Sequence, residues 1–232
     1  MKLDKLFTDL FDAPSFSRDE IDTFATDHLA KLNNNNPSAI YTAVIAATTT
    51  KLQAFKDNLV GASGSLGVQM GSTNTKNVAK EALLAFVSRK AKALSDIFYN
   101  NKPAYIEFYP RGLDEYNHAG LEELATLAGR YKTATAKYVV PLGAGFKTEA
   151  DVLMDAYINS RAVQVGKKGT ANDGNITVNA VRKALTIQLT VNVHTIAINN
   201  VDNLTAITTY FNESLLYNEV ATIKVAVVVP TL

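Results

Sequence analysis

Apolar residues recur at helical spacing along most of this chain. Ile21, Phe24 and Leu32 lie on one face of a helix, with His28 or Ala25 between the last two, and Ser17 precedes this segment as an N-cap. The same spacing predicts a short helix over 3–10 and further helices over about 38–59, 74–100, 113–138, 148–166 and 204–215. The dominant element is therefore the amphipathic helix.

Glycines interrupt this pattern in two places. Gly61, Gly64, Gly67 and Gly71 follow one another closely, and a glycine costs ~1 kcal/mol per interior helical position. We therefore predict a flexible loop over 60–73. Gly166 and Gly169 likewise predict a helix end, followed by a turn at 171–174.

Residues 177–200 support two interpretations. Between 185 and 194, apolar and polar residues alternate strictly, as in a half-buried strand. However, Leu185, Leu189 and Ile196 also fit one helical face, and Ile187, Val191 and Ile198 fit a second. An uninterrupted span this long far exceeds the ~5–6 residues of a usual strand. We predict a helix that is buried on more than one side.

The end of the chain differs from the rest. Val220–Val229 is rich in β-branched residues and apolar on both alternating faces, which predicts a strand. A short aromatic segment at 104–109, between Pro103 and Pro110, is a candidate partner strand within the chain. The predicted fold is mainly α: a bundle of about six to eight helices over 1–219, with a C-terminal strand or tail over 220–232.

Composition excludes several classes of function. The chain has no cysteine, which removes disulfides, thiolate catalysis and cysteine-ligated metal sites. A net charge of +1 provides no field for nucleic acid or anionic lipid. There is no apolar stretch long enough to span a membrane and no signal-peptide pattern at Met1–Leu10. We therefore expect a cytoplasmic protein without nucleic-acid or membrane partners.

Two segments partly match the motifs of known chemical sites. Glu115-x-x-His118, with Glu122 one turn later, matches half of a helical di-iron site, but the sequence has no second Glu-x-x-His. Val165–Thr170 lacks the first glycine and the hydroxyl residue of a phosphate-binding loop. We predict no catalytic, cofactor-binding or metal-binding residues, with a helical-bundle metalloenzyme around Glu115 as the third-ranked function.

The remaining signal is a shortage of charge. Charged residues make up 19% of the chain, against the ~25% usual in soluble domains. Only six of them lie between Ile176 and Leu232. We predict a non-catalytic structural protein that assembles with copies of itself into a homo-oligomer or filament. A helical adaptor that binds a second protein through the aromatic middle third is the alternative.

The predicted assembly interface has three parts. The tail contributes half of its residues, and whether the tail strand pairs within or between chains is open. The interface residues are Ile223, Val225, Val227, Val228 and Val229 in the tail, Ile106 and Phe108 in the 104–109 segment, and Ile187, Val191 and Ile198 on the second helical face.

Overall fold

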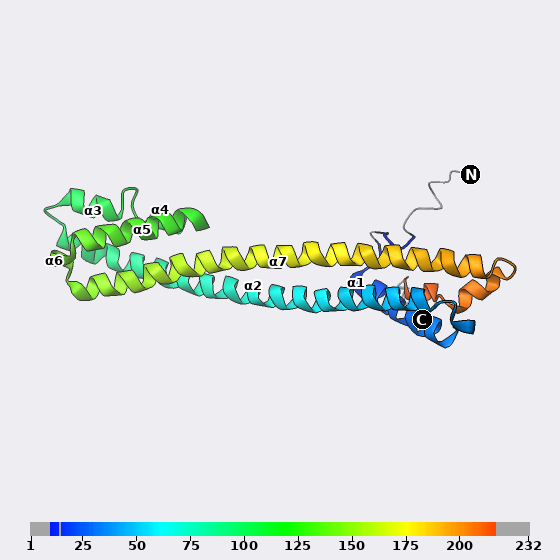
Figure 1. Cartoon of the computed structure of the whole chain (residues 1–232). Coiled ribbons are helices and arrows are strands. Elements are labelled where there is room, and N and C mark those ends of the chain that lie inside the picture. The colour runs from blue at the N-terminus through cyan, green and yellow to red at the C-terminus, as the bar shows by residue number, and fades with distance from the viewer. Residues whose placement is uncertain (1–9, 14, 217–232) are drawn as a thin grey trace, which may run out of the picture. The chain divides into compact units, whose positions relative to one another are not determined.

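A computed structural model of the chain describes residues 10–13 and 15–216 (Figure 1). All regular secondary structure in these residues is helical, which confirms the predicted mainly α bundle. The α-helices are α1 (Arg18–Asn34), α2 (Thr42–Ile97), α3 (Lys102–Phe108), α4 (Asp114–Asn117), α5 (Leu121–Lys137), α6 (Val139–Leu142) and α7 (Ala144–Asn199). Short 3₁₀ helices are η2 (Pro37–Ala39), η3 (Leu204–Thr209) and η4 (Glu213–Leu215). The predicted helix over 3–10, apart from its last residue, and the predicted strand over 220–229 lie outside the described residues.

The described residues divide into two compact units. Unit 1 joins the residues up to Ala62 to those from Gly174 onward, and unit 2 is Ser63–Asp173. Each of the long helices α2 and α7 contributes one part to each unit. The expectation of one helical domain over 1–219 with a separate tail stays a prediction.

Unit 1 begins with a well-capped helix. The Ser17 hydroxyl accepts a hydrogen bond from the Glu20 amide at 3.1 Å, and the Glu20 carboxylate accepts one from the Ser17 amide at 2.6 Å. This capping box satisfies two amide groups that would otherwise be unpaired at the helix start. The buried face of α1 then packs against the first part of α2 and the last part of α7 (Figure 1). The core of unit 1 includes Ile21, Phe24, Ala25, Leu52, Phe55, Val178, Leu185 and Leu189.

Unit 2 has a more aromatic core. The helices α3 to α6 pack with the second part of α2 and the first part of α7 (Figure 1). Phe108 and Tyr131 are fully buried, with ring centroids 5.1 Å apart in an edge-to-face arrangement. The buried aromatic residues of this core are Phe86, Phe98, Phe108, Tyr109, Tyr116, Tyr131 and Tyr157.

The glycine-rich segment is not a loop. Both α2 and α7 continue without a break, so the predicted loop over 60–73 and the predicted helix end and turn over 166–174 are wrong. The four glycines at 61–71 have open space where a Cβ would lie, so their cost is confined to helix propensity. Gly174 is different, because a Cβ there would lie 3.6 Å from the Cα of Ala62. Small residues at these two positions bring the backbones of α2 and α7 close together.

The aromatic segment at 104–109 is also not a strand. It lies almost wholly in α3, where the Asn101 side chain accepts a hydrogen bond from the Ala104 amide at 3.3 Å. Ala104 and Phe108 are buried four residues apart, and the rings of Tyr105 and Tyr109 pack at 5.2 Å with the same spacing. Helical neighbours four apart, together with a capped start, outweigh the local β propensity of aromatic residues.

The ambiguous segment over 177–200 is helical up to Asn199, as predicted. Leu185, Leu189 and Ile196 are fully buried, whereas Ile187 and Val191 are exposed. Among the described residues, the helix is therefore buried on the first of its two apolar faces and exposed on the second, so the prediction that it is buried on more than one side is wrong within this chain.

Candidate assembly surface

One face of α7 in unit 1 exposes a row of β-branched residues. The exposed fractions are 66% for Ile176, 47% for Ile187, 46% for Val191 and 76% for Ile198. The three isoleucines are 11 residues apart, which is close to three turns of 3.6 residues, so each lies only about 20° further around the helix than the last. All four residues fall within a sector of about 60°. We call these four residues the apolar face of α7.

Residues on other sides of the same helix are already used inside unit 1. Val178, Leu185 and Leu189 are fully buried against α1 and α2. The apolar face is therefore additional to what the core of unit 1 needs. Single exposed aliphatic residues are ordinary, and it is the alignment of four of them on one helix that makes this face a candidate interaction surface.

A second apolar feature lies at the two ends of the described chain. It is a pocket of about 520 Å³ in unit 1. Leu10, the first described residue, and Leu216, the last, both line it. The described lining is Leu10, Phe11, Phe16, Phe24, Val193, Ile207, Thr208, Phe211, Glu213 and Leu216. We call this the terminal pocket.

Hydrogen bonds to α7 hold one wall of the terminal pocket. The Leu10 amide donates to the Thr190 hydroxyl at 3.1 Å. The Arg182 guanidinium donates to the Asp12 carboxylate and to the carbonyl oxygens of Ala13 and Phe16, each at 3.2 Å. A long side chain on α7 thereby fixes the segment that precedes α1.

Beside this pocket, three helices meet at a buried polar cluster. His28 on α1, Thr48 on α2 and Asn192 on α7 are all fully buried. The Asn192 amide nitrogen lies 3.0 Å from Nε2 of His28 and 2.7 Å from the Thr48 hydroxyl. The other imidazole nitrogen, Nδ1, lies 2.8 Å from the carbonyl oxygen of Tyr210. With Asn192 donating to Nε2, the imidazole proton belongs on Nδ1, where Tyr210 accepts it.

Burial keeps this imidazole neutral. Desolvation lowers the pKa of His28 to about 4, although the Tyr210 carbonyl and Asp27 act in the opposite direction. The ring also stacks on Phe211, with centroids 4.2 Å apart, and Phe211 lines the terminal pocket. The cluster therefore positions the segment that follows α7 rather than offering an acid or base to solvent.

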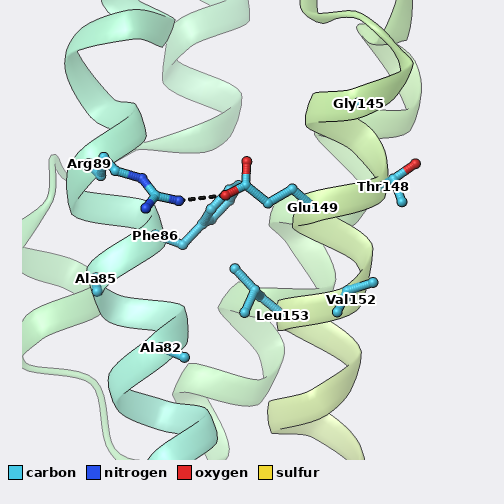
Figure 2. Close-up of a pocket in the computed structure, with 9 residues that line it drawn as sticks. All are labelled: Ala82, Ala85, Phe86, Arg89, Gly145, Thr148, Glu149, Val152 and Leu153. Atoms are coloured by element: carbon cyan, nitrogen blue, oxygen red, sulfur yellow. Dashed lines mark hydrogen bonds and ion pairs between the residues drawn. The ribbon is translucent and has the colours of Figure 1, made fainter.

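Unit 2 has a groove of about 760 Å³ between α2 and the start of α7. Figure 2 shows Arg89 reaching from α2 to Glu149 on α7, where the guanidinium and carboxylate lie 2.5 Å apart. Lys90 also lies 2.8 Å from Glu149, and hydrogen bonding to Lys90 lowers the pKa of that carboxyl. Glu149 is thus paired with two cations, and the walls of the groove are mainly Ala82, Ala85, Phe86, Val152 and Leu153.

The candidate metal residues are not brought together. Glu115 lies 2.5 Å from Arg130, Glu122 pairs with Arg161, and Nδ1 of His118 lies 3.0 Å from the Asp114 carbonyl oxygen. Among the described residues, no three His, Asp or Glu side chains are grouped as metal ligands. Each carboxylate is committed to an arginine instead.

The predicted interface residues are placed in different surroundings. Ile187, Val191 and Ile198 share one exposed face, as their spacing predicts. Ile106 is exposed on α3, but Phe108 is fully buried in unit 2 and does not offer a surface. The five tail residues, Ile223, Val225, Val227, Val228 and Val229, lie outside the described residues.

Two features of the site were not predicted from the sequence. Ile176 extends the apolar face by one more step of 11 residues, a recurrence that is visible in the sequence. The terminal pocket combines residues from both ends of the chain, and no local pattern signals such an arrangement.

No family model matches this chain, and searches of curated proteins and of solved structures found no match. Among the helices in the described part of the chain, none is both apolar and long enough to cross a bilayer.

Proposed function

We propose that this protein is a non-catalytic structural protein that assembles with copies of itself through the apolar face of α7. The observation that carries this proposal is the row of Ile176, Ile187, Val191 and Ile198, which is exposed and aligned on one helix. Burying such side chains against another molecule is favourable by roughly 25 cal/mol per Å² of apolar area.

The regular spacing suits a helix as the partner. An 11-residue recurrence keeps a contact in register along a neighbouring helix when the two helices form a right-handed supercoil. A copy of this chain carries the same row, so two copies can cover each other's apolar face around a two-fold axis. The low charge of residues 176–232 provides little repulsion against such a contact.

The alternative is a helical adaptor that binds a different protein. This adaptor would bind its partner through the aromatic middle third of the chain. However, the aromatic residues Phe108, Tyr109, Tyr116 and Tyr131 are buried in the core of unit 2. Self-assembly is therefore the better-supported proposal, since its surface is exposed.

A charge placed on the apolar face tests the proposal. We expect the full-length protein to sediment as an oligomer at tens of micromolar, and V191E to weaken the association at least tenfold because a carboxylate would be desolvated in the contact. Analytical ultracentrifugation over a concentration series measures both.

The matched control is V60E, which places the same charge at a valine of α2 that is 74% exposed and outside the apolar face. It should assemble like the wild type. A wild-type chain that stays monomeric at these concentrations contradicts self-assembly, and equal effects of V191E and V60E contradict the assigned surface.

A further inference from the structure

We infer that the terminal pocket binds the C-terminal segment Val220–Val229 of a second copy of this chain. This inference rests on the proposed self-assembly and names a second contact for it. Two chains that exchange such segments form a domain-swapped contact, or an open chain of subunits when the exchange does not close.

The pocket has the size and lining for an apolar segment. Its volume of about 520 Å³ falls within the roughly 300–1,000 Å³ of typical ligand sites. Eight of its ten described lining residues are aromatic or aliphatic, and the polar two are Thr208 and Glu213. A partner with several aliphatic side chains and little charge fits this lining.

The C-terminal segment has that composition. Its ten residues, Val220–Val229, include one charged residue, Lys224. Residues 1–9 precede the lining residue Leu10 in the sequence, but four of them are charged: Lys2, Asp4, Lys5 and Asp9. The lining therefore favours the C-terminal segment as the occupant.

The single charges on the two sides are complementary. Glu213 is the one charged residue among the described lining residues, and it is exposed. It makes no ion pair with another described residue. Lys224 stands inside the apolar segment, so pairing it with Glu213 fixes which part of the segment lies at the pocket.

Two observations favour a second copy over the chain's own segment. Only three residues separate Leu216, which is part of the pocket wall, from Val220, and this is a short connection for laying the segment in the chain's own pocket. In an extended conformation the segment is also apolar on both faces. The chain's own pocket can cover only one face of the segment. A segment that lies between two copies can have one face covered by each copy.

Reversing the two charges in full-length protein tests the inference. Residue 213 is exposed, so E213K should fold normally. E213K and K224E should each weaken assembly ~3–10-fold, because each replaces an attraction of a few tenths to 1 kcal/mol by a repulsion. The double variant E213K/K224E should regain wild-type assembly.

Mixing the two single variants distinguishes exchange from self-docking. Within E213K both groups are positive, and within K224E both are negative. Across the two chains every pocket then meets a segment of opposite charge, so an equimolar mixture should recover wild-type association in sedimentation or energy-transfer measurements. A mixture that stays as weak as its components overturns docking between copies.

A stronger variant gives a second readout. V225D/V227D should abolish the contact, while N218D/T231D adds the same charge outside Val220–Val229 and should not. Assembly of V225D/V227D at wild-type strength overturns this inference and leaves self-assembly through α7 standing. A wild-type chain that is monomeric overturns both proposals.

Discussion

The two units solve the burial of polar groups in different ways. The core of unit 1 contains an uncharged cluster, in which His28, Thr48 and Asn192 satisfy one another and the Tyr210 carbonyl. The core of unit 2 contains tyrosine hydroxyls and an ion pair. There the Tyr116 hydroxyl donates to the Phe108 carbonyl at 2.8 Å, and Arg130 binds Glu115, whose side chain is 2% exposed.

These solutions make the two cores sensitive to different perturbations. Burial raises the pKa of Tyr116 to about 12, so its hydroxyl stays neutral at ordinary pH. The stability of unit 2 should instead be sensitive to the loss of Arg130, because Arg130 is the charged partner of the buried Glu115. The stability of unit 1 should be sensitive to low pH, because burial of the His28 imidazole favours its neutral form.

The largest expected effect is the loss of Arg130. In R130M the Glu115 carboxylate would be buried without its partner, which typically costs about 3–5 kcal/mol. Urea unfolding followed by circular dichroism measures this loss of stability. Hydrogen exchange should show loss of protection mainly within 63–173.

Two variants provide the controls for this result. R130M/E115Q removes the unpaired charge and should recover a large part of the loss. R89M breaks the exposed ion pair with Glu149 and should cost about 0–1 kcal/mol. Equal losses in R130M and R89M would show that burial of Glu115 has no energetic importance.

The next effect is acid destabilisation of unit 1. The folded-state pKa of His28, about 4, lies below its value of 6.5 in an unfolded chain. The unfolded chain then binds the extra proton first, so the stabilising contribution is complete above pH 6.5 and is lost as the pH falls toward 4. The total loss is about 3 kcal/mol, at 1.36 kcal/mol per pKa unit.

Urea titrations between pH 7 and 4.5 test this prediction. In this window Glu107 and Glu149 contribute little, since their pKa values are lowered below 4.5. H118Q alters an exposed imidazole and should keep the wild-type slope, whereas H28F should be less stable but nearly independent of pH here. A wild-type stability that is flat over this range would refute the assigned state of His28.

The smallest expected effects on stability come from glycine substitutions, which test the local backbone preference in both units. Gly61 in unit 1 and Gly67 in unit 2 both lie in α2 with open space around them, so G61A and G67A should each stabilise the protein by about 0.5–1 kcal/mol. Gly112 also has open space, but its φ of +77° lies in the left-handed region, so G112A should cost about 1–2 kcal/mol. Thermal unfolding measures all three, and stabilisation by G112A would contradict this interpretation.

Local signals in the sequence were sufficient for much of the helical structure. Ser17 and Glu20 mark a helix start, and apolar spacing over 177–200 identifies a helix with two apolar faces. The glycines at 61–71 led to a wrong prediction of a loop, because the low helix propensity of glycine has a smaller effect than the packing of the helix on either side. At 104–109, aromatic residues suit both a strand and a helix, and only the contacts of Phe108 and Tyr109 decide between them.

The candidate site was less predictable than the fold. Periodicity reveals which residues of α7 share a face, but not which of its two faces α1 will cover. The terminal pocket needs Leu10 and Leu216 to line the same cavity, and this arrangement results from the fold of the whole unit. His28 fits the apolar face of α1 in the sequence, while its partners Thr48 and Asn192 are far away along the chain.

The Arg182 contacts have a consequence for binding. Three acceptors in Asp12, Ala13 and Phe16 bind Arg182 and hold the segment before α1 in place within the folded chain. Ordering a loop on association normally consumes part of the interaction free energy as lost conformational entropy. Here that loss is already met during folding, so an incoming segment encounters a preorganised wall and retains more of its hydrophobic gain as affinity.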